Sequence, residues 1–332
     1  MKDVSVEIKR IFDVMTYKAE VYKFNGIFMC KDSKENKIKS FGVSDVDSYR
    51  LNTRNTKFRI GSITKGITAM SIMILKSRGL LNIEDELGKY IKNYEKGKNV
   101  TIYNLLTHTS GIREHKTKEF LEKSMGGISI DEIIDEFRHK ELLYVPGLKF
   151  DYSHSNYVLL AKIIESITKK KYQEFVTENI FIPLGMENTG FYFLENVDQN
   201  NATGYDVSYP LFEKSMRISS TAPYGTGDIH SNCEDLIKWD EALYTEKLIP
   251  KELMEEYLTP KVEVDEKRMY GYGWYFPKKN IERMYHIGTM PGFATFFIRD
   301  KKMKRLGIVL SNDNSSLKMI EELEEYNLEG II

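Results

Sequence analysis

Residues 57–75 read KFRIGSITKGITAMSIMIL, and the interpretation of the whole sequence starts from this stretch. Residues 57–61 have the composition of a short strand, and residues 63–75 are apolar on nearly all sides, which predicts a buried helix. Its most apolar part, residues 67–75, is about half as long as a membrane span requires, so we interpret it as a core helix. Ser62 stands where the strand passes into the helix.

Ser62 and Lys65 form a Ser-x-x-Lys pair at the start of this helix. The positive end of a helix dipole favours an oxyanion at that position, and a spacing of three residues puts both side chains on one face. An alcohol needs a base to remove its proton, and burial lowers the pKa of a lysine toward the range in which it can act as one. We predict that Lys65 is buried against Ser62 and either accepts its proton or holds a neighbouring phenolate ready to do so. The alternative is a helix-capping serine beside a lysine that reaches solvent.

Two other Ser-x-x-Lys pairs occur, at Ser166/Lys169 and Ser315/Lys318. Ser166 ends a predicted helix and Ser315 begins a charged one, so we expect both to be solvated.

The sequence contains no GxSxG, no HExxH and no GxGxxG after a strand. Residues 61–66 imitate the start of a phosphate-binding loop, but Ile67 stands where that loop requires its lysine.

Composition excludes several functional classes for this chain of 332 residues. Its 48 basic and 49 acidic residues give a formal charge of -1, so no general attraction to nucleic acid or anionic membranes is expected. Cys30 and Cys233 match no disulfide or metal-ligand spacing, which predicts two buried free thiols and no metal or organic cofactor. Residues 1–12 contain no apolar signal region, and we therefore expect a cytoplasmic protein without a membrane span.

The order of predicted elements indicates an α/β (α+β) fold. An amphipathic helix over residues 4–18 precedes two strand-like runs, and four more strand candidates followed by a charged helix close the chain. The strand candidates are 24–30, 37–43, 273–276, 283–287, 293–299 and 306–310. We therefore expect one antiparallel sheet that is built from both chain termini and flanked by helices.

Between these ends, residues 81–220 read as short helices joined by polar loops. Capping boxes mark helix starts at Ser129 and at Ser231, the second opening a helix over residues 235–244. We expect residues 1–80 and 221–332 to form the sheet domain, residues 81–220 to form a mostly helical insertion, and the active site to lie in the cleft between them.

Four further segments accompany the serine in the order found in a known family. With FRIGSITK at 58–65, they are LLTHTSG at 105–111, YSHSNY at 152–157, PLGM at 183–186 and HIGTMPG at 286–292. From Phe24 to the last helix, the chain resembles the serine β-lactamase and penicillin-binding-protein superfamily. The resemblance is to the class C β-lactamase-like branch, which includes D-alanyl-D-alanine carboxypeptidases, D-aminopeptidases and esterases, and it implies the β-lactamase/transpeptidase fold.

The resemblance implies a role for each matching residue. Ser62 would be the acylated nucleophile, Lys65 its partner, and Tyr152 the hydroxyl that moves a proton between serine and leaving group. The backbone N–H groups of Ser62 and Thr289 would form the oxyanion hole.

The triplet at 286–288 corresponds to the family's Lys-Thr-Gly or His-x-Gly element, which lines the cleft on an edge strand. His286 would belong to the catalytic set, with a hydrogen-bonded strand histidine as the alternative. Gly288 would leave room for a substrate backbone beside the strand.

His154 departs from the family pattern, because it stands where the family usually has asparagine. That asparagine donates to the substrate amide and contacts the lysine, whereas a neutral histidine offers a single N–H. We expect weakened recognition of penicillin-type side chains, and a pH dependence if His154 titrates beside Lys65. For the other histidines, including His108, a structural role is expected.

These residues predict a serine hydrolase that acts through an acyl-enzyme on a small amide or ester, most simply a D-alanyl-D-alanine carboxypeptidase, another D-peptidase or an esterase. The alternatives are a true class C β-lactamase and a non-catalytic binding or sensor protein with the same fold. The expected partner is a small-molecule or short-peptide substrate, not nucleic acid. The acyl group, the leaving group and the oligomeric state are not readable from the sequence.

Overall fold

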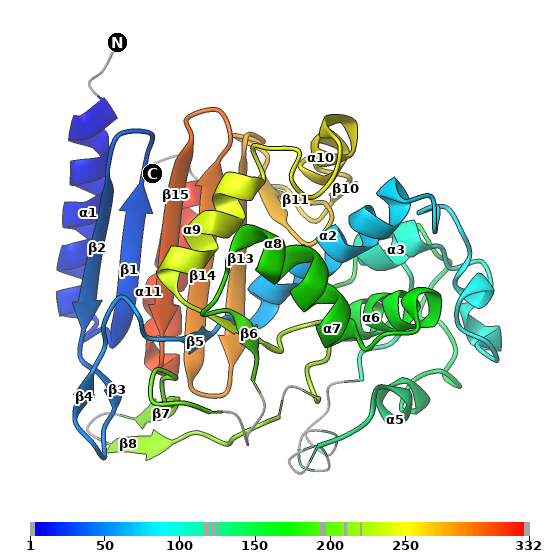
Figure 1. Cartoon of the computed structure of the whole chain (residues 1–332), viewed down its shortest axis with the longest axis horizontal. Helices are drawn as coiled ribbons and strands as arrows, with labels where there is room; N and C mark the ends of the chain where they lie inside the picture. The colour runs from blue at the N-terminus through cyan, green and yellow to red at the C-terminus, as the bar shows by residue number, and fades with distance from the viewer. Residues whose placement is uncertain are drawn as a thin grey trace.

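An eight-stranded antiparallel sheet forms the centre of the computed structural model (Figure 1), which describes residues 4–115, 120, 122, 124, 127–192, 197–208, 211–219 and 221–328. Its strands are β1 (Gly26–Lys31), β2 (Asn36–Phe41), β10 (Val262–Glu263), β11 (Arg268–Tyr270), β12 (Tyr275–Pro277), β13 (Arg283–Met290), β14 (Phe293–Asp300) and β15 (Arg305–Ser311). The order across the sheet is β10-β11-β12-β13-β14-β15-β1-β2. Strands from both ends of the chain therefore form one sheet, which confirms the predicted fold class.

Alternation along the strands gives the sheet two apolar faces. On β1, Ile27 and Met29 belong to one buried cluster, while Phe28 and Cys30 belong to the other. Successive side chains of a strand point to opposite faces, so a central strand with both faces covered is apolar throughout. The pairing of β1 with β15, which sets Ile27 opposite Leu310, brings the two chain ends into register.

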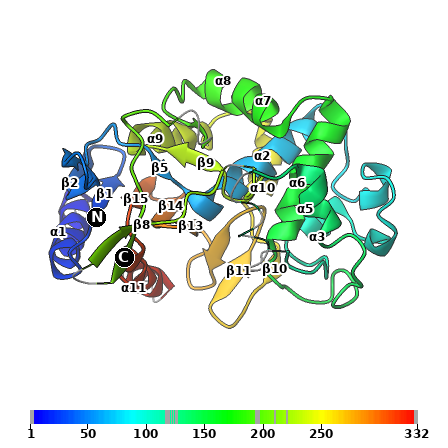
Figure 2. The ribbon, with the colours of Figure 1, turned by 90° about the horizontal axis from the view of Figure 1, so that it is seen from below.

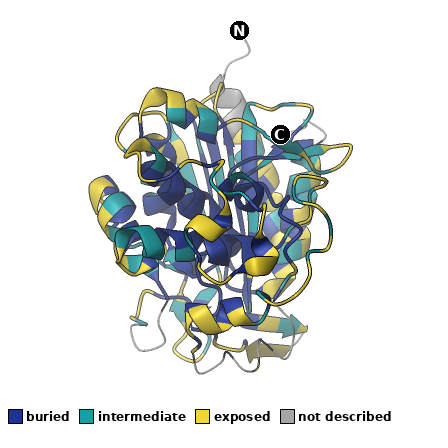
Figure 3. Cartoon of the chain, turned by 90° about the vertical axis from the view of Figure 1, so that its right-hand side faces the viewer, coloured by how far each residue is buried: buried dark blue, intermediate teal, exposed yellow. Residues whose placement is uncertain are grey.

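Helices cover both faces of the sheet, as Figure 2 shows from below. α1 (Val4–Val21) and α11 (Leu317–Leu328) pack on one face, and α2 (Thr64–Ser77) and α9 (Cys233–Ala242) lie on the other. Figure 3 shows buried residues concentrated in the sheet and in the helices that contact it. Within the described residues, no helix is both long and apolar enough to cross a membrane.

The other helices and strands are shorter. The helices are α3 (Ile102–Leu106), α5 (Ile130–Asp135), α6 (His154–Thr168), α7 (Tyr172–Val176), α8 (Ile182–Leu184) and α10 (Lys251–Tyr257). The strands are β3 (Val43–Asp45), β4 (Arg50–Leu51), β5 (Phe58–Arg59), β6 (Gly190–Phe191), β7 (Tyr205–Ser208), β8 (Leu211–Lys214) and β9 (Ile229–Ser231). Residues 81–220 were expected to hold helices, and the structure adds β6, β7 and β8 there. β6 is two residues long, too short to show an alternating pattern.

Local capping explains where two helices begin. The predicted capping box at Ser129 is present in both halves at the start of α5. The helix expected over residues 235–244 instead spans Cys233–Ala242, because its N-cap is Asn232 and not Ser231. The Asn232 side chain accepts the backbone N–H of Asp235 at 2.9 Å, while Ser231 is the last residue of β9.

The strand that carries the His-x-Gly triplet lies inside the sheet, where an edge strand was expected. β13 has neighbours on both sides, β12 and β14. β12 contacts it through one pair, Tyr275 with Tyr285, and beyond that pair His286, Ile287 and Thr289 line a cavity. β13 therefore presents an open edge over half its length, although it is not the outermost strand.

Candidate active site

Ser62 lies in a 3₁₀ turn, Gly61–Ile63, that joins β5 to the buried helix α2. Gly61 has φ +53°, and a Cβ at this position would lie 2.6 Å from the backbone nitrogen of Thr289. Only glycine allows so close an approach between the turn and β13. The glycine of the turn therefore places the serine next to the open edge of β13.

Three side chains from distant parts of the sequence meet at the Ser62 hydroxyl. The Lys65 Nζ lies 3.1 Å from Ser62 Oγ, and the Tyr152 hydroxyl donates a hydrogen bond to the same oxygen at 3.0 Å. Lys65 is fully buried, and its Nζ also donates to the Thr226 carbonyl at 2.9 Å. The other two Ser-x-x-Lys pairs are unlike this one: Ser166 is half-buried at the end of α6, and Ser315 is exposed.

Tyr152 comes from the loop just before α6 and is held by its neighbours. Its ring lies 4.4 Å, centroid to centroid, from the ring of His108, which is fully buried in the 105–111 segment. Burial raises the pKa of the Tyr152 phenol well above its usual value of 10. The phenol therefore stays protonated at neutral pH, as its donation to Ser62 requires.

His286 of β13 completes this side of the site. Its Nδ1 donates to the Ile287 carbonyl at 2.7 Å, and Nε2 has no hydrogen-bond partner among the described residues. Burial, with a smaller contribution from the Lys65 charge, lowers the pKa of His286 to about 3. A neutral imidazole with one open nitrogen is thus available to a ligand.

Close packing around Gly288 requires a glycine at this position. A Cβ at this position would lie 2.0 Å from the Ile60 carbonyl oxygen and 2.3 Å from the Thr295 hydroxyl. The missing side chain therefore makes room for the segment before Ser62.

These residues share one cavity of about 250 Å³. It is lined by Ser62, Tyr152, His154, Arg268, Tyr275, Tyr285, His286, Ile287, Thr289 and Glu324. Five of the seven site residues predicted from the sequence line it. The other two adjoin them: Lys65 contacts Ser62, and Gly288 lies between Ile287 and Thr289 on β13. The cavity thus brings together the turn before α2, β13, α11, and the start of α6 with the loop before it.

Glu114 was not predicted from the sequence. Its Oε2 accepts the backbone N–H of His154 at 2.8 Å and lies 2.7 Å from the His154 Nδ1. Burial alone would raise the pKa of Glu114, but its hydrogen bonds and attraction to His154 lower it well below the usual range. A single glutamate 40 residues from its partner leaves no spacing signal, so only the fold could reveal the pair.

Behind Lys65 lies a second ionisable group, Asp228. Its carboxylate accepts the Gly225 backbone N–H at 3.0 Å, and the turn between them supplies the Thr226 carbonyl that contacts Lys65. Complete burial raises the pKa of Asp228 to about 7. The Asp228 carboxyl group, which interacts with the Lys65 charge, therefore ionises near neutral pH.

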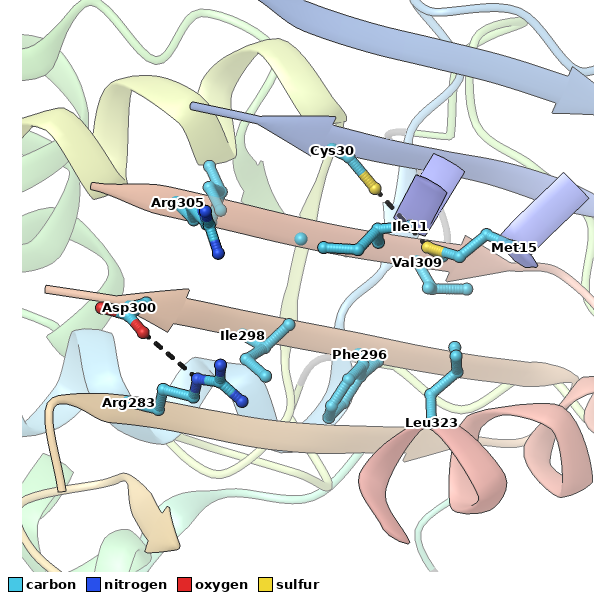
Figure 4. Close-up of a pocket in the computed structure, with 12 residues that line it drawn as sticks. Ile11, Met15, Cys30, Arg283, Phe296, Ile298, Asp300, Arg305, Val309 and Leu323 are labelled. Carbon is cyan, nitrogen blue, oxygen red and sulfur yellow. Dashed lines mark hydrogen bonds and ion pairs between the residues drawn. The ribbon is translucent and has the colours of Figure 1, made fainter. Parts of the chain in front are cut away.

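A second cavity lies between α1 and α11, on the face of the sheet that these two helices cover (Figure 4). Apolar side chains such as Met15, Phe296 and Leu323 line it, and Arg283 pairs with Asp300 at 3.2 Å on its border. Its one thiol is that of Cys30, whose pKa burial raises to about 12, so the nucleophilic thiolate does not form at neutral pH. Both cysteines are free and buried, as predicted.

Comparisons with known proteins agree with this geometry. A family model described as Beta-lactamase matches residues 25–330. Among curated proteins, the putative penicillin-binding protein PbpX of Bacillus subtilis (strain 168) is 31% identical over 85% of this chain and 68% of its own length. Protein flp of Staphylococcus aureus (strain N315) is 28% identical over 90% of this chain and 61% of its own length. The chain thus spans roughly two thirds of these relatives.

Solved structures give the same result. An octameric penicillin-binding protein homologue from Pyrococcus abyssi superposes with a TM-score of 0.83 at 28% identity, covering 97% of this chain and 77% of that one. A D-amino acid amidase from Ochrobactrum anthropi SV3 has the same fold, with a TM-score of 0.80 at 22% identity over 93% of this chain and 94% of that one.

Proposed function

Because this chain belongs to the beta-lactamase family of serine hydrolases, we propose that it hydrolyses a small amide or ester through an acyl-enzyme at Ser62. The observation that carries the proposal is the convergence of two proton-transfer groups on one alcohol. Lys65 Nζ and the Tyr152 hydroxyl lie 3.1 and 3.0 Å from Ser62 Oγ, within reach of a proton transfer. Such an arrangement has no evident structural purpose, because a buried amine is costly to fold.

Acylation assigns a different task to each group. The amine of Lys65, in its neutral form, accepts the Ser62 proton as Oγ attacks the substrate carbonyl carbon. Tyr152, whose high pKa keeps it protonated, gives its proton to the leaving nitrogen or oxygen when that bond breaks, and it is reprotonated from Lys65. This favours lysine over a phenolate as the base. The backbone N–H groups of Ser62 and Thr289 stabilise the oxyanion.

For the substrate, we infer a D-peptidase, of which a D-alanyl-D-alanine carboxypeptidase is one kind, or an esterase. Two observations support this choice over a true class C β-lactamase: the His-x-Gly triplet, and relatives that are named as penicillin-binding proteins. In addition, His154 stands where the family usually has asparagine, which argues against β-lactam turnover. Given the expected cytoplasmic location, peptidoglycan-like peptides reaching the cytosol or simple esters would be suitable substrates.

We also infer that the site lies between two units, residues 1–80 with 221–332, and residues 81–220. Ser62 and His286 come from the first, while Tyr152, His154 and Glu114 come from the second. A small rotation of one unit against the other would change the distance from Tyr152 to Ser62, so substrate binding can be coupled to the alignment of the groups.

A substrate panel tests the proposal. Short peptides ending in a D-amino acid, a p-nitrophenyl ester and a chromogenic cephalosporin are offered to the protein and to Ser62→Ala. We expect turnover of a peptide or the ester, slow or no turnover of the cephalosporin, and none of these activities in Ser62→Ala. Absence of turnover, together with absence of an adduct with any acylating probe, would instead identify a non-catalytic binder.

A further inference from the structure

Glu114 and His154 form a hydrogen-bonded pair at the wall of the cavity that contains Ser62. One carboxylate oxygen of Glu114 receives both the backbone N–H of His154 and its ring nitrogen Nδ1, at 2.8 and 2.7 Å. The backbone contact is fixed by the first turn of α6, so the glutamate is held in the position where it orients the ring.

This arrangement determines which ring nitrogen of His154 carries a proton. The carboxylate stays ionised, since its pKa is held well below the usual range, and it has no proton to donate. Nδ1 must therefore be the donor, which leaves Nε2 as the basic nitrogen of the neutral ring. A carboxylate that fixes a histidine in this way is also how a serine-protease triad prepares its general base.

His154 is also better placed to meet water than His286 or Lys65. Its side chain is 20% exposed, whereas His286 is 3% exposed and Lys65 is fully buried. Its ring stands perpendicular to that of Tyr152 with centroids 5.4 Å apart, and Tyr152 bonds Ser62 directly. The pair thus borders the space beside the serine from the solvent side.

We propose that His154 is the general base that activates water to hydrolyse the acyl-enzyme, and that Glu114 is the positioning residue that holds its tautomer. The inference rests on the proposed acyl-enzyme at Ser62. In this step the water oxygen bonds to the acyl carbon and its proton passes to His154 Nε2. The bond from the acyl carbon to Ser62 Oγ then breaks, Oγ takes the proton of Tyr152, and the proton on His154 returns to Tyr152 through solvent. The product is a free carboxylic acid.

The proposal separates the two halves of the reaction. Lys65 and Tyr152 serve acylation, while Glu114 and His154 serve deacylation. A purely structural role for the pair, or a role in binding the substrate amide, would affect acylation at least as strongly.

Burst kinetics with p-nitrophenyl acetate measure both halves in one trace. His154→Asn, which introduces the residue usual in the family, and the isosteric Glu114→Gln are compared with the wild type. We expect His154→Asn to lower the steady-state rate by about 10²-fold, within the range typical of a general base, and Glu114→Gln by about tenfold. The burst rate should fall far less in both, and intact-mass measurement should show the acyl adduct accumulating.

Hydroxylamine distinguishes a lost base from a damaged site. It attacks an ester without needing a base, so it should restore turnover in both variants and change the wild type little. Glu114→Asp, which keeps the carboxylate, should be less impaired than Glu114→Gln. The matched control is His139→Asn, the same substitution at an exposed histidine outside the cavity, and it should leave burst and steady-state rates unchanged.

The outcomes are distinct. A wild-type burst and adduct with unchanged deacylation in both variants would overturn this inference and leave the proposed function standing. Equal losses in burst and steady-state rates would also overturn it, because the pair would then serve acylation or folding. A wild type that neither turns over the ester nor forms an adduct with any acylating probe would overturn the proposed function and this inference with it.

Discussion

Two cavities against the central sheet, one at the open edge of β13 and one between α1 and α11, differ in chemistry. The one at the open edge of β13 measures about 250 Å³ and is bordered by a serine, two histidines and three tyrosines, with a fully buried lysine next to the serine. The one beneath α1 and α11 measures about 70 Å³ and is mainly apolar. A buried amine costs stability unless it is hydrogen bonded. The hydrogen-bonded polar groups therefore identify the active site more reliably than the presence of a cavity does.

The largest expected effect comes from the amine of the polar cavity. Lys65→Met keeps the volume of the side chain and removes its Nζ. Loss of the base should lower the acylation rate by about 10³-fold, within the range attributed to general acid–base catalysis. The thermal unfolding midpoint should hold or rise, because a buried polar amine is replaced by an apolar group. The acylation rate is measured from the burst phase with a p-nitrophenyl ester, and a variant that acylates at the wild-type rate would contradict the assignment.

The apolar cavity should respond in the opposite way. Leu323→Ala removes a 2% exposed side chain from its wall, and enlarging an apolar cavity costs about 2–5 kcal/mol of unfolding free energy. Acylation of Ser62 by the folded variant should be unchanged. Denaturant unfolding and burst kinetics test both statements, and a loss of acylation rate without a loss of stability would show that this face takes part in the reaction.

A smaller effect concerns Asp228, behind the lysine. Its pKa is raised from the ordinary 3.8 to about 7, so its contribution to stability is complete below about pH 4 and is lost as the pH rises through 7. Asp228→Asn removes this term, because the amide is neutral at every pH. The unfolding midpoint of the variant, relative to the wild type, should therefore be higher at pH 8 than at pH 5. A difference that is constant or smaller at pH 8 would contradict the shift.

The smallest expected effect is at Cys30, in the apolar cavity. Because burial raises the pKa of its thiol to about 12, iodoacetamide at pH 8 should leave Cys30 unmodified in the native protein and modify it after unfolding in urea. Peptide mass mapping reads out both states. Rapid native labelling would mean that this cavity opens to solvent and is less different from the active-site cavity than we describe.

Features of the structure that depend only on residues close together in the chain could be predicted from local sequence patterns. Ser62 and Lys65 are three residues apart on one helix, and β14 alternates between two apolar faces, so both features are visible in short windows. Tyr152 lies 90 positions from Ser62, and only the family resemblance connected the two. Glu114 and the partial pairing of β13 with β12 depend on tertiary contacts alone, which explains why neither was predicted.

The central claim is that the nucleophile is Ser62, and locating the covalent adduct tests it most directly. The protein is treated with a fluorophosphonate and, separately, with a penicillin, digested and mapped by tandem mass spectrometry. We predict one stoichiometric adduct on Ser62 and none in the Ser62→Ala variant. An adduct on another residue, or one of equal yield in the variant, would contradict the claim.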